Sequence, residues 1–302
     1  MASAGDVAAS VPAPMLHSRE ENTHMDQATT RNERLIGDIA ALQAPKIEDF
    51  QFVRFRVEAE VARLTLARGE HNLLNERMLS ELAEGIRRIG DMREIKLIVI
   101  DSEAKAFCGG IELGEYTQRR VFQLLDAFHN AFITMMDTAK PVMVVVNGPA
   151  FGGGSELAAL ADLVVATPKA RFAQPEIKLG VFPPLSAVIL PYVLGPKVAL
   201  ELVLTGEVMT AERAFELGLV NRLVPENLLE KTVKDLIAKV TAQSGPVLTM
   251  AKRAILGSMG CSLRDGVRNS MKIFLNELSD LEDSQEGLRA LVEKRAPKWK
   301  NR

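Results

Sequence analysis

The sequence predicts an α/β protein, and two observations support this prediction. From residue 47 onward, stretches with the two-residue period of strands alternate with stretches of helical period, and the last part of the chain shows helical patterns alone. With 302 residues, of which 47% are hydrophobic, the chain is long enough for one large core and a small appendage. The expected elements before the appendage are strands at 52–57 and 61–66, a helix over 78–89, a strand at 96–101, a helix over 121–132, and strands at 142–146 and 163–166.

The first two expected strands alternate apolar with polar residues and are separated by a short turn, as in a hairpin. The helix after them has one apolar face, formed by Met78, Leu79, Leu82, Ile86 and Ile89. A similar face in the second helix is formed by Val121, Leu124, Leu125, Phe128 and Phe132. The later strands are nearly unbroken apolar runs, which indicates burial on both faces of a parallel sheet.

Beyond Pro225 the strand pattern ends. We expect three helices there, over 229–240, 247–256 and 263–295, each with an apolar stripe. Stripes of this kind on a helical appendage are suited to contacts between subunits.

Residues 1–45 are rich in small and polar side chains and lack apolar periodicity before Leu35, so we expect a largely disordered tail. Acidic residues in this tail, among them Asp6, Glu20, Glu21 and Asp26, argue against an organelle transit peptide.

Charge and cysteine content restrict the partners and the compartment. Lys and Arg number 37 against 39 Asp and Glu, so nothing points to nucleic acid or an acidic membrane as the main partner. No apolar run is long enough to span a bilayer. Cys108 and Cys261 form neither a metal-binding spacing nor a disulfide framework, which favours a reducing compartment, and we expect a cytoplasmic protein.

Two glutamates, Glu156 and Glu176, are the most informative feature for function. Glu156 follows a glycine run at the point where the apolar strand 142–146 gives way to a helix, and the start of a helix exposes backbone N–H groups. Glu176 follows a proline in an expected loop and has an apolar neighbour, so burial would raise its pKa and let it hold a proton at neutral pH. Two carboxyl groups in different surroundings can divide the roles of base and acid.

The same glycine run offers an oxyanion donor. Gly153 is the best candidate, because a residue without a Cβ lets an acyl oxygen approach its amide. A second strand is followed by the glycine-containing loop 106–113, in which Ile111 is the candidate partner donor. The alternative is that both glycine clusters are only tight turns, and that Glu156 only stabilises the first turn of its helix.

Other catalytic arrangements fail on spacing. Ser155 lacks the following glycine of a nucleophile elbow and a histidine downstream, and the glycine run lacks both the phosphate-loop lysine and the dinucleotide-binding spacing. The four histidines are scattered, so no metal site is expected. Cys108 lies beside the second glycine loop with no basic neighbour, and we expect a small buried thiol there.

Several segments together resemble the enoyl-CoA hydratase/isomerase (crotonase) superfamily. The most specific is Asn-Gly-Pro-Ala-Phe-Gly-Gly-Gly-Ser-Glu-Leu-Ala at 147–158. The others, in the family's order and spacing, are 140–142, 161–163, 172–176, 204–206 and 214–221. The resemblance runs from about residue 52 to the C-terminus.

The resemblance implies a spiral of ββα units in residues 46–236 and a C-terminal helical region in 237–302 that forms trimers or pairs of trimers. It places the oxyanion hole at the N–H groups of Ile111 and Gly153. It aligns Glu156 and Glu176 with the two glutamates that flank a water in hydratases. Since isomerases commonly lack one of them, the presence of both favours hydration, with Glu156 deprotonating water and Glu176 exchanging a proton at the substrate carbon.

Coenzyme A enters only through the resemblance, as part of a thioester substrate, and no separate cofactor is implied. Its adenine and phosphates would lie near residues 68–72, which include Arg68 and Asn72, and near the loop 108–111. That loop contains Cys108, Gly109 and Gly110. Lys294 of a neighbouring subunit would contact a phosphate, and the alternative for Lys294 is a solvated helix end.

The chain departs from the family after the second glutamate. Typical hydratases have a glycine-rich turn ending in Gly-Gly-Thr, whereas this chain has Gly-Val-Phe-Pro-Pro-Leu-Ser-Ala at 180–187. Bulkier, stiffer residues should reshape the acyl pocket, with Phe182 and Leu185 expected to frame it. This version resembles the cyclohexa-1,5-dienecarbonyl-CoA hydratase-like subgroup. The first loop also has Gly-Ile-Glu at 110–112 where Gly-Ala-Asp is usual.

The sequence therefore predicts a hydro-lyase that adds water to a 2-enoyl-CoA or a cyclic dienoyl-CoA. Alternatives on the same fold are a double-bond isomerase and an acyl-CoA hydrolase. An alternative of another class is a non-catalytic scaffold or RNA-binding relative, against which the balanced charge and the glutamate pair argue.

Overall fold

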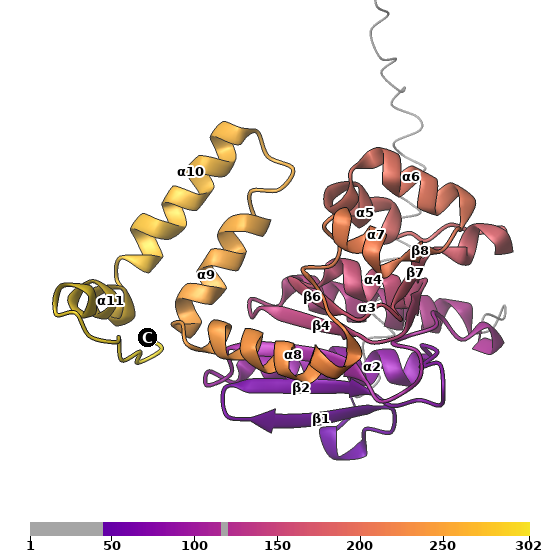
Figure 1. Ribbon diagram of the computed structural model, residues 1–302, viewed down its shortest axis with the longest axis horizontal. Coiled ribbons are helices and arrows are strands. Elements are labelled where there is room, and N and C mark those ends of the chain that lie inside the picture. Colours follow the sequence, from indigo (N-terminus) through magenta and orange to yellow (C-terminus); the bar gives the residue numbers. More distant parts are fainter. Residues whose placement is uncertain (1–44, 116–119) are drawn as a thin grey trace, which may run out of the picture. The chain divides into compact units, whose positions relative to one another are not determined.

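The computed structural model describes residues 45–115 and 120–302, and a six-stranded sheet lies at its centre (Figure 1). The strand order is β1-β2-β3-β4-β6-β9, in which β1 and β2 form an antiparallel hairpin and the remaining neighbours are parallel. The strands are β1 Val53–Glu58, β2 Val61–Leu66, β3 Leu97–Ser102, β4 Val142–Val146, β6 Leu163–Ala166 and β9 Arg222–Leu223. The predicted hairpin and the buried parallel strands are therefore confirmed.

A second, three-stranded sheet connects the first one to the region of the two glutamates. It contains β5 Pro149–Phe151, β7 Arg171–Ala173 and β8 Met209–Thr210, in the order β5-β7-β8. Because two residues separate β5 from β4 and only Gly152 separates α4 from β5, this small sheet fixes where α4 starts.

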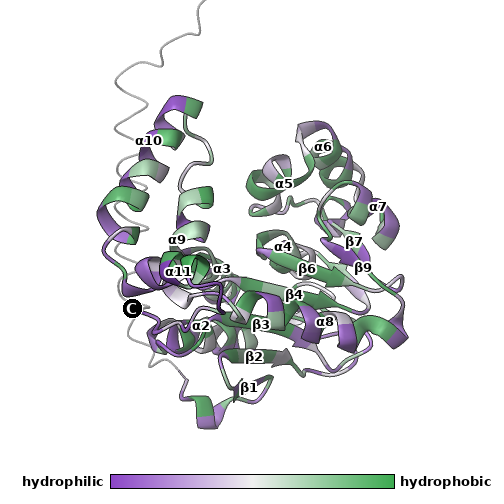
Figure 2. Cartoon of the chain, turned by 60° about the vertical axis from the view of Figure 1, so that its left-hand side comes forward, coloured by the Kyte–Doolittle hydropathy of each residue, from purple (hydrophilic) through white to green (hydrophobic). Residues whose placement is uncertain are grey.

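Among the described residues between 76 and 216, six α-helices surround the sheets. They are α2 Glu76–Asp91, α3 Val121–Asp137, α4 Gly153–Leu160, α5 Ser186–Leu194, α6 Pro196–Thr205 and α7 Ala211–Glu216. The apolar face predicted for α2 is buried, and Leu82 and Ile86 lie in the same core cluster as Phe132 of α3. The strands β2, β3 and β4 are hydrophobic along most of their length, in agreement with this core (Figure 2).

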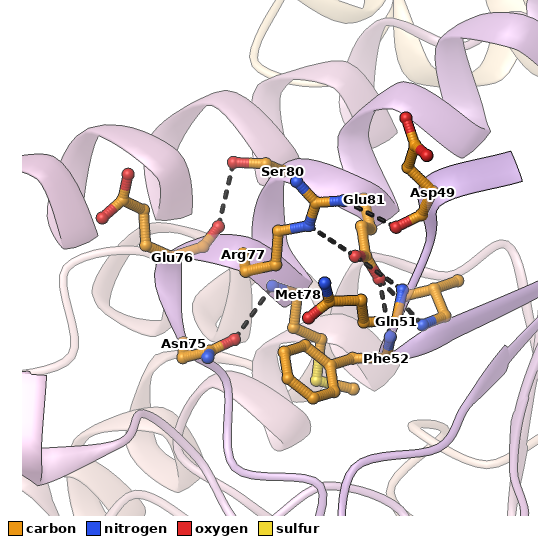
Figure 3. Close-up of polar contacts among 10 residues, drawn as sticks. Asp49, Gln51, Phe52, Asn75, Glu76, Arg77, Met78, Ser80 and Glu81 are labelled. Atoms are coloured by element: carbon orange, nitrogen blue, oxygen red, sulfur yellow. Dashed lines mark hydrogen bonds and ion pairs between the residues drawn. The ribbon is translucent and has the colours of Figure 1, made fainter. Parts of the chain in front are cut away.

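Helix α2 is attached to β1 by a buried carboxylate (Figure 3). The helix begins at the N-cap Asn75, whose side chain accepts a hydrogen bond from the N–H of Met78 at 2.9 Å. Glu81 is fully buried, and its carboxylate accepts hydrogen bonds from three consecutive backbone N–H groups and from Arg77 at 2.7 Å. The three backbone donors are Gln51, Phe52 and Val53. A buried carboxylate with this many donors is a structural group, in contrast to the two glutamates below.

The C-terminal part is helical, as predicted, with one correction. Its elements are α8 Glu226–Thr241, α9 Gly245–Leu256, α10 Leu263–Ile273, a π-helical turn Phe274–Leu278 and α11 Glu282–Val292. The prediction of one helix over 263–295 is wrong, because the chain turns at 279–281. Leu281 has extended backbone angles, and the acidic Glu282 and Asp283 begin a new helix, where the helix dipole favours negative charge.

The C-terminal helices are joined to the core by lysines. Lys252 of α9 bonds to Asp162 at 2.7 Å and to the carbonyl of Lys140 at 3.1 Å. Lys96 donates to the carbonyl of Thr241 at 2.9 Å. Several apolar side chains of this region are more than half exposed in the single chain, namely Ile255, Leu263, Val267, Phe274, Leu275, Leu288, Leu291 and Val292. The trimer, which would cover such residues, stays a prediction.

Some sequence predictions fall where the structure does not test them. The disordered tail predicted for residues 1–45 lies outside the described residues apart from Pro45. The predicted boundary between residues 236 and 237 falls inside α8, and the division into a core and an oligomerisation region stays a prediction. Within the described ranges, no helix is both long and apolar enough to pass through a membrane.

Candidate active site

The two glycine segments of the sequence lie directly against each other. Cys108 donates its N–H to the carbonyl of Pro149 at 3.1 Å, and its carbonyl accepts from the N–H of Phe151 at 2.9 Å. A Cβ on Gly154 would lie 2.3 Å from that same Cys108 oxygen, so only glycine fits there. The glycines therefore allow two backbone segments to pack together, and their role in an oxyanion hole stays a prediction.

Both candidate oxyanion donors lie at this junction. The segment around Ile111 is fixed by Leu74, which donates to the carbonyl of Gly110 at 2.7 Å and accepts from the N–H of Glu112 at 2.9 Å. A Cβ on Gly153 would lie 4.0 Å from Cγ1 of Ile111. Within residues 45–115 and 120–302, neither the N–H of Ile111 nor that of Gly153 donates a hydrogen bond. Two unpaired backbone donors on adjacent segments can serve a developing oxyanion.

Glu156 lies at the fourth position of α4, with only 2% of its surface exposed. Its Oε1 accepts a hydrogen bond of 2.8 Å from the N–H of Ser186, the first residue of α5. Burial raises the pKa of Glu156 from about 4.5 to about 7, against the opposing effect of the Ser186 N–H, and the charge of Glu176 raises it further. The group can therefore gain and lose a proton near neutral pH.

Glu176 lies in the short 3-10 helix Pro175–Leu179, where the sequence predicted a loop; Pro175 suits the first position of such a turn. A Cβ on Gly152 would lie 2.3 Å from Oε1 of Glu176, and Gly152 has a φ of 48°. Burial raises the pKa of Glu176, as expected, and its Oε2 is buried without a hydrogen-bond partner in the described chain. The carboxyl group thus lies directly beside the residue that precedes the Gly153 donor.

These positions bring the two carboxyl groups together. Glu156 and Glu176 interact electrostatically across the start of α4, next to the unpaired N–H of Gly153. An acid and base pair beside two backbone donors can transfer protons to and from a carbonyl compound while its oxygen becomes negative.

Arg68 and Asn72 shape the neighbouring loop. Asn72 is fully buried, and its backbone has a φ of 47°. Its side-chain NH2 group donates to the hydroxyl of Ser102 at 2.8 Å and to the carbonyl of Phe107 at 3.1 Å. Arg68 bonds to the carbonyl of Leu73 at 2.7 Å and to Glu112 at 3.2 Å. The Asn72 side chain therefore already makes its hydrogen bonds within the protein. A contact of Arg68 or Asn72 with CoA stays a prediction.

The loop 108–111 contains no reactive thiol. Cys108 is fully buried, and burial raises its pKa to about 12, so the prediction of an inert buried thiol is confirmed. Gly109 donates to the carbonyl of His71 at 2.7 Å, and Gly110 has a φ of 101°. Contact of this loop with CoA is untested.

The remaining predicted residues are more dispersed. Phe182 is 63% exposed, while Leu185 is partly buried against the core at the start of α5. They lie on one segment, and the framing of an acyl pocket stays a prediction. Lys294 is exposed just after α11 with a φ of 52°, which fits a solvated helix end, and its phosphate contact requires a second subunit.

Sequence reasoning missed the role of Ser186 as a partner of Glu156. The two residues are thirty positions apart, and only the folded path of the chain before α5 brings them together. The ion pair between Arg68 and Glu112 was also missed, although the unusual glutamate after Ile111 had been noted. Among the described residues, no group of three or more potential metal ligands is found.

Comparison with known proteins places the chain in one family of enzymes. Residues 56–302 match the family model described as enoyl-CoA hydratase/isomerase. A probable mitochondrial enoyl-CoA hydratase of Dictyostelium discoideum is 34% identical over 89% of this chain and 99% of its own length. The cyclohexa-1,5-dienecarbonyl-CoA hydratase of Thauera aromatica is 30% identical over 81% of this chain and 95% of its own.

A solved structure agrees with these relatives. The enoyl-CoA hydratase of Mycobacterium smegmatis superimposes with a TM-score of 0.78 at 29% identity, over 82% of this chain and 99% of that one. The chain belongs to the enoyl-CoA hydratase/isomerase family of the crotonase superfamily. The predicted crotonase fold and the prediction of an enoyl-CoA hydratase-like enzyme are thereby confirmed, and the subgroup is left open because several relatives have about 30% identity.

Proposed function

We propose that this protein adds water across the double bond of a 2-enoyl-CoA, with a cyclic dienoyl-CoA as the more specific candidate. The main support is the pair of carboxyl groups with raised pKa values, the buried Glu156 and the half-buried Glu176, beside the unpaired N–H groups of Ile111 and Gly153. Burying two carboxyl groups without pairing them to cations costs stability, which a purely structural site would have no reason to retain.

The reaction follows from the roles of the two glutamates. Glu156 takes a proton from water while the water oxygen bonds to Cβ of the conjugated double bond. The π electrons move to give an enolate, whose oxygen accepts hydrogen bonds from the N–H groups of Ile111 and Gly153. Glu176 then donates a proton to Cα, which completes the addition of one water molecule. Exchange of the proton from Glu156 to Glu176 through solvent restores the starting state.

Both carboxyls are suited to proton transfer. The pKa of Glu156 is raised to about 7, so this group can gain and lose a proton near neutral pH. Burial also raises the pKa of Glu176, whose Oε2 is buried without a partner in the described chain. The division of the two roles comes from the resemblance to hydratases. The requirement for one deprotonated and one protonated carboxyl predicts a bell-shaped dependence of kcat/KM on pH.

The cyclic substrate is favoured by two observations. The segment 181–184 is Val-Phe-Pro-Pro in place of a glycine-rich turn, and one of the relatives at 30% identity hydrates cyclohexa-1,5-dienecarbonyl-CoA by name. Homotrimers or pairs of trimers, covering the exposed apolar residues of α10 and α11, belong to the same proposal. The cytoplasm is proposed as the compartment from cysteine usage, although the named relatives include mitochondrial ones.

The proposal is tested by following the loss of the conjugated thioester absorbance with crotonyl-CoA and with a cyclic dienoyl-CoA. Glu156→Gln and Glu176→Gln should each lower kcat by about 10²–10⁴-fold without unfolding the protein. Glu230→Gln, on an exposed glutamate of α8, is the control and should retain full activity. Migration of the double bond without added water, or release of free CoA, would instead identify an isomerase or a hydrolase. Binding of a partner that ignores both glutamates, with no turnover, would identify a scaffold.

A further inference from the structure

Ser186 presents a buried hydroxyl next to the Glu156 carboxylate. The residue is 1% exposed, and its N–H bonds to Oε1 of Glu156 at 2.8 Å. Its Oγ is buried and makes no hydrogen bond of ordinary geometry within residues 45–115 and 120–302. The hydroxyl is nevertheless one of the groups that lower the pKa of Glu156, so it lies beside the same carboxylate, and its oxygen can still accept a hydrogen bond from another group.

A buried hydroxyl without a partner costs about 1–3 kcal/mol. Nine buried side-chain atoms of the described residues lack a partner, and two of them, Oγ of Ser186 and Oε2 of Glu176, lie at the carboxyl pair. The structural carboxylate of Glu81, in contrast, has four donors. An ordered water in a protein interior makes two to four hydrogen bonds, and Glu156 and Ser186 supply two acceptors for it.

At the position of Ser186 this chain also differs from typical hydratases. Ser186 occurs in Pro-Leu-Ser-Ala at 184–187, the segment that replaces the glycine-rich turn of typical hydratases. A serine there adds a hydroxyl and keeps the backbone N–H that binds Glu156.

We propose that Ser186 is a third catalytic contact of the reacting water, an inference that rests on the hydratase function proposed above. Its Oγ accepts one hydrogen of the water while Glu156 accepts the other. The lone pair of the water is thereby aimed at the substrate carbon. Glu176 does not have to hold the water and remains protonated for transfer to Cα.

The test compares Ser186→Ala and Ser186→Gly with Ser244→Ala. Both changes at 186 retain the N–H to Glu156. Ser186→Ala removes only the hydroxyl, and Ser186→Gly removes Cβ as well. Ser244 is the matched control, since it is 2% exposed and its Oγ is likewise buried and unpaired in the described chain, but it lies at the N-terminus of α9. The measurements are kcat and KM for the best enoyl-CoA substrate, and the thermal midpoint of each variant.

We expect kcat of both Ser186 variants to fall about 5- to 150-fold, the equivalent of one lost hydrogen bond, with KM changed less than threefold. Their thermal midpoints should equal or exceed that of the wild type, because an unpaired buried hydroxyl is removed. Ser244→Ala should retain wild-type kcat.

Two results would overturn the inference while leaving the hydratase proposal intact. One is a kcat within twofold of wild type for both Ser186 variants when Glu156→Gln is inactive. The other is an equal loss in Ser244→Ala, which would point to general loosening of the protein. Absence of hydration by the wild type itself would refute the proposed function, and the role of Ser186 with it.

Discussion

Replacing Glu156 by Gln should stabilise the protein in a pH-dependent way. The pKa of Glu156 is raised from about 4.5 to about 7 by burial, so between these pH values the native state holds a proton that the unfolded state has lost. The free energy of unfolding therefore decreases as pH rises through this window. A difference of about 2.5 pH units, at about 1.36 kcal/mol for each, corresponds to about 3 kcal/mol above pH 7.

Gln keeps an oxygen that can accept the Ser186 N–H, but it does not ionise. The variant should match the wild type near pH 4.5 and exceed it by up to about 3 kcal/mol at pH 8. Urea unfolding at pH 5 and pH 8, at one fixed protein concentration, measures this difference. The same variant should be nearly inactive. A variant that is more stable but inactive would show that the protein loses stability by burying an ionisable group that its activity requires.

The control has the opposite sign. Glu230 is exposed and its pKa is lowered by Lys234, so its ionised form contributes stability above its ordinary pKa that is lost as pH falls. Glu230→Gln should therefore gain nothing at pH 8. A stability difference between Glu156→Gln and wild type that is the same at pH 5 and pH 8 would refute the reasoning about burial of Glu156.

Two further substitutions test the geometry. Gly152→Ala would place a Cβ 2.3 Å from Oε1 of Glu176, at a residue whose φ is 48°. We expect kcat to fall at least tenfold and the free energy of unfolding to fall by about 1–3 kcal/mol, as measured by steady-state kinetics and a melting curve. A fully active variant would show that Glu176 need not lie beside Gly152. Lys252→Met leaves Asp162 without its cation, and the two side chains are only 9% and 21% exposed. Urea unfolding should therefore show a free energy of unfolding that is lower by about 2–4 kcal/mol. An unchanged unfolding midpoint would mean that this ion pair does not hold α9 to the core.

Much of the fold could be predicted because its signals are local. The hairpin, α2 and the buried strands β3, β4 and β6 follow from the periodicity of apolar residues, and the structure has them within a few positions of their predicted bounds. The break between α10 and α11 could not be found in this way. The apolar stripe continues across 279–281, and the turn depends on a change of backbone at Leu281 that no strong breaker residue announces.

For the candidate site, too, the local features could be predicted and the long-range contacts could not. The glutamates and the two glycine loops stood out in the sequence, but only the fold shows that Gly154 packs on Cys108 and that Gly152 faces Glu176. The sequence predicted a raised pKa for Glu176, whereas the larger shift, to about 7, belongs to the more deeply buried Glu156. Burial and the contact with Ser186 depend on segments thirty residues apart, which local patterns do not encode.

A crystal structure of the Glu176→Gln variant with a bound 2-enoyl-CoA tests the central claim most directly. The account predicts the thioester oxygen at about 2.7–3.1 Å from the backbone nitrogens of both Ile111 and Gly153, with one water between Glu156 and the double bond. A thioester oxygen that contacts neither amide, or a double bond placed away from both carboxyl positions, would contradict it.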